Sequence, residues 1–297
     1  MIPALSKKDL YAWCQVPAEE LLTHPNRKIA LRICKTERDM AELMARELVD
    51  EIKSHLQGDA VFRAIIPCGP NGWYEPFTRL VNTEEVPLGN LVVFHMDECL
   101  DWQGRTLPKR HPYNFRTYME EHFYEPVQPK LRVPVENRYW LDGTNAERVA
   151  DEIASKPIDL VYGGWGQDGH VAYNQACRNA YSSVSIDDLR SSTVRVQTNS
   201  QDTVIALAHR RFGAAYQFVP PMSVTLGMKE LLSAKKIRLF SDTGPWKQTA
   251  LRVALFGPIT AEYPMTLLQG HADVVLTATK ATARHPISEH PEWDVII

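Results

Sequence analysis

A short run of β-branched and aromatic residues at 158–162 (IDLVY) passes directly into a glycine-rich segment, Gly163-Gly164-Trp165-Gly166-Gln167-Asp168-Gly169-His170. Such a run predicts a buried strand that breaks into a tight loop. Open α/β sheets bind their ligands in the loops at the carboxyl ends of their strands. A carboxylate two residues from an imidazole can also fix the tautomer of the ring and raise its basicity. The sequence therefore predicts a reactive site around Asp168 and His170.

The rest of the chain predicts alternating strands and helices. Further strands are expected at residues 28–34, 61–66, 91–96, 193–196, 236–240 and 273–277. Helices are expected at 17–23, 113–124, 146–154, 224–232 and 247–254. Another helix is capped by Thr36 and has Met40, Met44, Leu48 and Ile52 on one face, and a further short helix ends near Val81. This alternation predicts an α/β fold, a modified Rossmann-type, doubly wound and mainly parallel sheet flanked by helices.

The domain boundaries are read from the same pattern. We expect a loosely attached N-terminal arm over residues 1–27, a single α/β domain over 28–283 and a C-terminal tail over 284–297. The segment 176–192 is rich in Ser, Asp and Arg, which is typical of a lid-like surface loop.

Composition narrows the function classes. The net charge of −3 over 297 residues offers no field that would attract nucleic acid or an anionic membrane. Five scattered cysteines without C-x-x-C spacing favour a reducing compartment. The N-terminus shows no secretory pattern and no run of about 18 apolar residues occurs. We therefore expect a cytoplasmic protein.

Several motifs have both a functional and an ordinary interpretation. Gly164-x-Gly166-x-x-Gly169 matches the dinucleotide fingerprint, but His170 to Ala176 is a poor helix start, so nicotinamide binding is not favoured. Asp97 and Glu98 follow a strand, where they either face the ligand or serve as solvated strand-end carboxylates or a helix cap. His111 precedes Pro112 and is more typical of a helix cap. Lys247 and the pair Arg210-Arg211 either hold an anion or are solvated. No histidine pair has the spacing of zinc ligands, and no cysteine nucleophile is indicated.

Taken together, these segments resemble the glucosamine-6-phosphate deaminase (isomerising) family over roughly residues 28–283. The motifs that carry the resemblance are 94–98 (FHMDE), 111–115 (HPYNF), 164–174 (GWGQDGHVAYN), 219–227 and Lys247. The Asp-Gly-His loop alone is shared with 6-phosphogluconolactonases. The Met-Asp-Glu strand end and the continuation Val-Ala-Tyr-Asn resemble the deaminase branch.

The resemblance implies a set of roles. Asp97 would be the base that moves a proton between C2 and C1 of an open-chain sugar. His170 would assist ring opening, with Asp168 orienting it. Arg211 and Lys247 fall where the family binds the sugar phosphate. Neither step requires a metal or an organic cofactor, so we expect none, and we expect a small sugar or sugar phosphate as ligand, with a homo-oligomer left open.

The chain departs from the family at two places. The phosphate-binding turn reads Gly69-Pro70-Asn71-Gly72-Trp73, in which Pro70 has no N–H and Trp73 adds bulk. Gly69, Asn71 and Gly72 are still expected to face the substrate, as is Glu98. Gln175 stands where the family has the glutamate of its histidine network, and it is expected beside the imidazole.

Two alternatives to the deaminase reading stay open. One is a lactonase-like hydrolase that uses His170 as its base and releases an acid. The other is a sugar-binding sensor that keeps the pocket but has lost part of the machinery, as Gln175 suggests. The joint presence of Asp97, Asp168 and His170 argues against the sensor.

Overall fold

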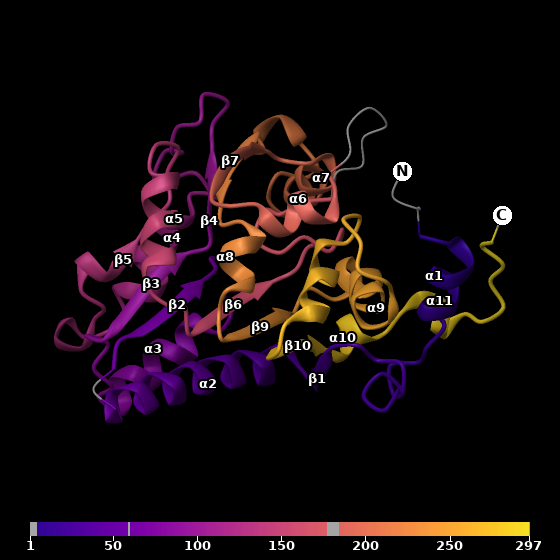
Figure 1. The fold of residues 1–297 in the computed structure, drawn as a ribbon, viewed down its shortest axis with the longest axis horizontal. Coiled ribbons are helices and arrows are strands. Elements are labelled where there is room, and N and C mark those ends of the chain that lie inside the picture. Colours follow the sequence, from indigo (N-terminus) through magenta and orange to yellow (C-terminus); the bar gives the residue numbers. More distant parts are fainter. Residues whose placement is uncertain (1–4, 59, 177–183, 297) are drawn as a thin grey trace.

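The computed structural model describes residues 5–58, 60–176 and 184–296. Its main feature is a parallel sheet of seven strands in the order β1-β10-β9-β6-β2-β3-β5 (Figure 1). The strands are β1 Ala30–Cys34, β10 Val274–Thr279, β9 Lys236–Ser241, β6 Leu160–Gly164, β2 Phe62–Ile66, β3 Leu91–His95 and β5 Arg138–Tyr139. The predicted doubly wound α/β fold is confirmed.

A second sheet was not predicted. It consists of the antiparallel strands β4 Asp97–Leu100, β8 Met222–Thr225 and β7 Arg195–Thr198, with Asp97 paired with Thr225. Residues 222–225 therefore form a strand, and the helix predicted at 224–232 is wrong in its first turn. The helix of this region, α8, is Met228–Leu232.

Helices cover both faces of the main sheet. They are α1 Lys7–Cys14, α2 Glu37–Gln57, α3 Tyr74–Thr83, α4 Phe115–Met119 with a π-helical continuation Glu120–Tyr124, α5 Ala146–Ser155, α6 Ile186–Ser191, α7 Gln201–Arg211, α9 Gln248–Phe256, α10 Lys280–Ala283 and α11 Pro286–Glu289. Short 3-10 turns are Pro129–Leu131, Val135–Asn137, Tyr216–Phe218, Gly244–Lys247 and Pro264–Gly270.

Two hydrophobic cores lie on opposite faces of the sheet, because side chains alternate along each strand. Phe62, Ala64 and Ile66 of β2 pack with α2 and α3, whereas Ile65 belongs to the core that contains α9. In Figure 1, α2 and α3 lie together below the sheet and α8 and α9 lie above it. The spacing of Met40, Met44, Leu48 and Ile52 thus correctly predicted the buried face of α2, which begins at a capping box formed by Thr36 and Asp39.

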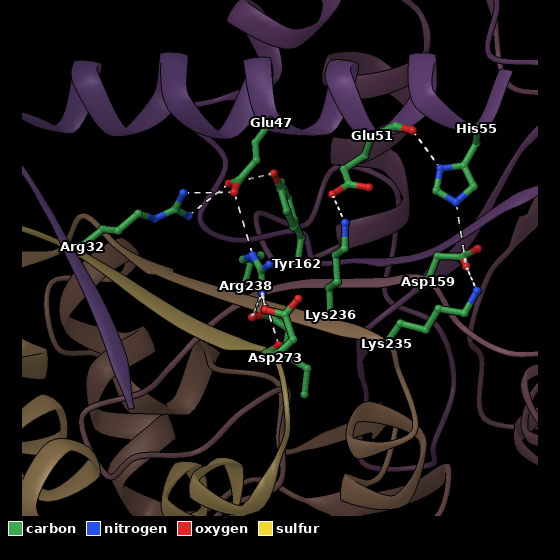
Figure 2. Close-up of polar contacts among 11 residues, drawn as sticks. Arg32, Glu47, Glu51, His55, Asp159, Tyr162, Lys235, Lys236, Arg238 and Asp273 are labelled. Carbon is green, nitrogen blue, oxygen red and sulfur yellow. Dashed lines mark hydrogen bonds and ion pairs between the residues drawn. The ribbon is translucent and has the colours of Figure 1, made fainter. Parts of the chain in front are cut away.

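Charged contacts join α2 to the strands that it packs against (Figure 2). Glu47 accepts hydrogen bonds from Arg32 of β1 at 3.0 Å and from the hydroxyl of Tyr162 of β6 at 3.4 Å. One turn on, Glu51 pairs with Lys236 of β9. These contacts fix how α2 lies across the sheet, and so they also fix the position of its N-terminus.

The N-terminal segment packs onto the domain more tightly than the sequence predicted. Its helix is α1, and the helix predicted at 17–23 is wrong, since those residues form turns. Cys14 and Leu21 are buried, and the guanidinium of Arg252 in α9 donates to the carbonyl of Val16. Part of the predicted lid-like loop, residues 177–183, lies outside the described residues. Within the described ranges no helix is long and apolar enough to cross a bilayer.

Candidate active site

A cavity of about 180 Å³ opens at the carboxyl ends of four neighbouring strands. Its wall is made by the loops after β2, β3, β6 and β9, and helix α7 closes the remaining side. The residues that the sequence placed at this edge and that do line the cavity are Gly69, Asp97, His170 and Lys247. The predicted convergence of Asp97 and His170 on one cavity is confirmed, because both follow strands of one parallel sheet.

Asp168 and His170 form a hydrogen-bonded pair, in which the imidazole lines the cavity and the buried carboxylate lies behind it. The Oδ1 atom of Asp168 lies 2.6 Å from Nδ1 of His170, and the carboxylate is 1% exposed. Burial alone would raise the pKa of Asp168, but the charge of His170 and its hydrogen bond outweigh burial and lower the pKa to about 2. The carboxylate is therefore ionised at neutral pH and orients the imidazole.

The glycines of this loop make room for the imidazole. A Cβ atom at Gly166 would lie 2.1 Å from Cε1 of His170, so any side chain there would collide with the ring. Gly169 has a φ of +75°, a conformation that favours glycine. The glycine pattern thus serves the close approach of His170 to the backbone.

Tyr173 holds the other side of the imidazole. Its ring is nearly parallel to that of His170, with centroids 6.1 Å apart and an interplanar angle of 11°. The backbone N–H of Tyr173 donates to Oγ1 of Thr225 at 3.0 Å, and its hydroxyl contacts Sγ of Cys99 at 3.3 Å. Strands β8 and β4 of the small sheet therefore brace the tyrosine, which sequence reasoning did not single out.

Asp97 stands where β3 ends and β4 begins. Its side chain is half-buried on the cavity wall, and burial raises its pKa to about 8, with a further rise from the neighbouring charge of Glu98. A carboxyl whose pKa lies near neutrality is suited to exchange protons with a bound ligand.

Glu98 does not face the cavity. Its carboxylate accepts hydrogen bonds from the backbone N–H groups of Phe115 at 2.8 Å, Arg116 at 2.7 Å and Cys99 at 2.9 Å. Burial raises its pKa to about 7, although these N–H groups oppose the rise. The expectation that Glu98 binds substrate is wrong, and the alternative of a helix cap is confirmed, since the residue anchors the start of α4.

The cationic end of the cavity lies at β9. Lys247 is buried there, and burial followed by the charge of Arg210 lowers its pKa to about 8, while Asp242 opposes the shift. Arg210 and Asp242 line the cavity with it. Arg211 is not one of the lining residues. It lies near enough to Cys68 for its charge to oppose the rise that burial causes in the pKa of that thiol.

The altered turn after β2 places Pro70 on the cavity wall and Trp73 in the core. Pro70 lines the cavity, and its carbonyl accepts a hydrogen bond from Nε1 of Trp73 at 2.9 Å. Trp73 itself is fully buried among the aromatic rings of the α3 core, so its bulk points away from the cavity. Gly72 lines an adjacent groove, and Asn71 lines neither.

Gln175 is not placed beside the imidazole. Its Oε1 accepts the backbone N–H of Ser200 at the start of α7, and its Nε2 donates to the carbonyl of Tyr173 at 3.4 Å. The sequence could not reveal this, because the direction of the chain after residue 174 depends on the small sheet. His111 accepts the N–H of Tyr113 at 3.1 Å, as expected of a local cap.

Arg210, Asp242 and Tyr173 are among the lining residues that the sequence does not identify as site residues. The sequence offers Arg210 and Arg211 as a pair, and helical periodicity alone does not say which of the two faces inward. Among the described residues, no group of three His, Cys, Asp or Glu side chains is arranged to hold a metal ion.

Comparison with known proteins relates this chain to proteins named as sugar-phosphate enzymes. A protein from Aliivibrio fischeri named glucosamine-6-phosphate deaminase is 31% identical over 251 residues, which are 81% of this chain and 86% of the relative. One of that name from Yersinia pestis is 29% identical over 248 residues, 80% and 85% of the two chains. No family model matches the chain.

Solved structures share the fold. A monomeric glucosamine-6-phosphate deaminase aligns with a TM-score of 0.72 at 23% identity, covering 86% of this chain and 99% of the other. A 6-phosphogluconolactonase from Trypanosoma cruzi aligns with a TM-score of 0.61 at 18% identity, covering 88% and 97%. The sequence relationship is the more specific of the two, and by it this chain belongs to the glucosamine-6-phosphate deaminase family.

Proposed function

We propose that the protein is an isomerising deaminase, which converts an amino-sugar phosphate and water into a ketose phosphate and ammonia. The observation that carries the proposal is the position of Asp97, whose carboxyl lies on the wall shared with His170 and has a pKa raised to about 8. Aldose–ketose interconversion needs a base at C2 and a proton donor at the ring oxygen, and these two groups can supply them.

His170 opens the sugar ring by taking the proton of the C1 hydroxyl and passing a proton to the ring oxygen. Asp168 keeps the imidazole in the required orientation. Asp97 then removes the proton from C2 of the open-chain aldehyde while the ammonium group at C2 gives a proton to O1, which leaves an enolamine, and Asp97 returns its proton to C1. The resulting C2 imine adds water and releases ammonia, and the ketone remains on the sugar.

Lys247 and Arg210 are proposed to hold the anionic group of the substrate. They lie on the same wall at the end of β9 and on α7, and Lys247 is buried. A buried ammonium beside a guanidinium is stabilised in its charged form when an anion binds between them. Arg210 lines the cavity, and we therefore propose it for the anion-binding role that was expected of Arg211.

The test is product analysis with glucosamine 6-phosphate and the purified protein. Equal amounts of ammonia and fructose 6-phosphate support the proposal, and Asp97→Asn should suppress both. Incubation with 6-phosphogluconolactone tests the lactonase alternative, which is included because the chain shares its fold with a lactonase. Acid release without ammonia would favour that hydrolase, and ligand binding with neither product would favour the sensor.

A further inference from the structure

A second, larger groove borders the catalytic cavity. The groove measures about 710 Å³ and lies between the first turns of α2 and α3. Pro70 and Asp242 line both spaces, so the two meet at these residues. Ligand sites in proteins usually measure roughly 300–1,000 Å³. The catalytic cavity alone falls below this range, whereas the groove falls within it.

Strand order determines which end of a substrate points into the groove. Asp97 follows β3, whereas Asp242 and Lys247 follow β9, and β2 and β6 lie between these strands. Three strand spacings of roughly 4.8 Å put the two strand ends about 14 Å apart. The reacting carbons belong beside Asp97 and the anionic group beside Lys247. Asp242, whose charge acts on Lys247, also lines the groove, so the groove opens next to the anionic group.

Beyond Lys247 and Arg210, the meeting point offers little to a doubly charged phosphate. Pro70 offers no N–H to an oxyanion, and Asp242 adds a negative charge next to Lys247. A phosphomonoester carries a charge close to −2 at neutral pH, since its second pKa is about 6. A phosphodiester carries a single charge and therefore needs fewer donors and meets less repulsion from Asp242.

The groove itself is polar along its walls. Arg79 donates to Glu42 at 2.8 Å and lies 3.6 Å from Glu75. The charged residues of the walls are four acids and two bases: Glu37, Glu42, Glu75, Asp242, Arg38 and Arg79. This excess of carboxylates disfavours a second anion, while the carboxylate oxygens can accept hydrogen bonds from hydroxyl groups.

We propose that the groove is a subsite for a neutral, hydroxyl-rich group that is joined to the amino sugar through a phosphodiester. The proposal rests on the proposed function, and it names an extended amino-sugar phosphodiester as the substrate class. The diester bond stays intact, since isomerisation and deamination occur at C1 and C2.

The test compares glucosamine 6-phosphate with its glycerol phosphodiester in the full-length protein. We expect a kcat/KM at least ten times higher for the diester. Ala41→Phe fills the groove from α2, and Glu75→Ala removes an exposed wall carboxylate. Each should lower kcat/KM for the diester at least fivefold and change that for the monoester less than twofold. Ser54→Phe, on the exposed face of α2, should change neither.

An equal or lower kcat/KM for the diester overturns the proposal, as does an equal effect of the groove variants on both substrates. Failure of the proposed function looks different, because neither compound would then yield ammonia. Glu75→Ala keeps the test decisive if Ala41→Phe does not fold, and thermal melting of each variant shows which is folded.

Discussion

Oδ1 of Asp168 lies 2.6 Å from Nδ1 of His170, and the ring lines the cavity. A carboxylate at this distance keeps the proton on Nδ1, so Nε2 is the nitrogen left to exchange a proton with a ligand. The pair thus supplies an oriented base without any contact between Asp168 and the ligand.

Removing the base at Asp97 should separate catalysis from binding. We expect Asp97→Asn to lower kcat by about 10²–10⁴, the usual contribution of a general base. The dissociation constant for glucosamine 6-phosphate, measured by calorimetry, should change only a few-fold. Asp151→Asn, at an exposed position of α5, is the matched control. Full turnover by Asp97→Asn would assign the base to another residue.

The pH dependence of kcat/KM should be a narrow bell with its maximum near pH 8. The rising limb follows ionisation of Asp97, whose pKa is about 8, and the falling limb follows loss of the Lys247 proton, whose pKa is also about 8. Lys247→Arg should move the falling limb upward, because a guanidinium stays charged. A flat profile between pH 6 and 8 would contradict the role of Asp97.

Asp97 should also reduce stability as the pH rises. Its pKa is 3.8 in the unfolded chain and about 8 in the folded one, so between these values the folded state holds a proton that the unfolded state releases. The contribution of Asp97 to the free energy of unfolding therefore falls from pH 4 to pH 8 and stays constant above pH 8. The gain in Tm of Asp97→Asn over the natural protein should grow over that interval. A gain that does not depend on pH would argue against the raised pKa.

The contribution of Asp168 to stability depends on pH in the opposite direction. Its pKa falls from 3.8 in the unfolded chain to about 2 in the fold, so its contribution is present above pH 4 and disappears between pH 4 and pH 2. We expect Asp168→Asn to lose about 2 kcal/mol of unfolding free energy at pH 6. Denaturant titrations at pH 6 and pH 2 would measure this, and a difference that persists at pH 2 would point to lost packing instead.

Glu98 is expected to stabilise the start of α4, which borders the site. Glu98→Ala leaves three backbone N–H groups without their acceptor and should destabilise the protein by about 3 kcal/mol. Glu98→Gln keeps one oxygen acceptor and should recover part of this loss. Chemical denaturation of both variants is the measurement. Equal stability of the alanine variant and the natural protein would show that α4 does not need this anchor.

Local sequence patterns predicted much of the fold. The four-residue spacing from Met40 to Ile52 follows from the helical period. The strand predicted at 61–66 follows from a short apolar run that ends in a turn. The loop from Gly163 to His170 was predicted to end a strand at the functional edge because glycines interrupt a β-branched run. These features depend on neighbours within a few residues, so the chain alone contains them.

The tertiary structure decided which of these residues meet. Strands β4, β7 and β8 are short and come from distant parts of the chain, and their pairing directs Glu98 to the start of α4, Tyr173 to the imidazole and Gln175 to Ser200. The rotation of α7 selects Arg210 over Arg211 for the cavity. The strand pairings behind these contacts join residues that are tens of positions apart or more, such as Asp97 and Thr225. No local pattern specifies them, because only the packing of the completed sheets orients these side chains.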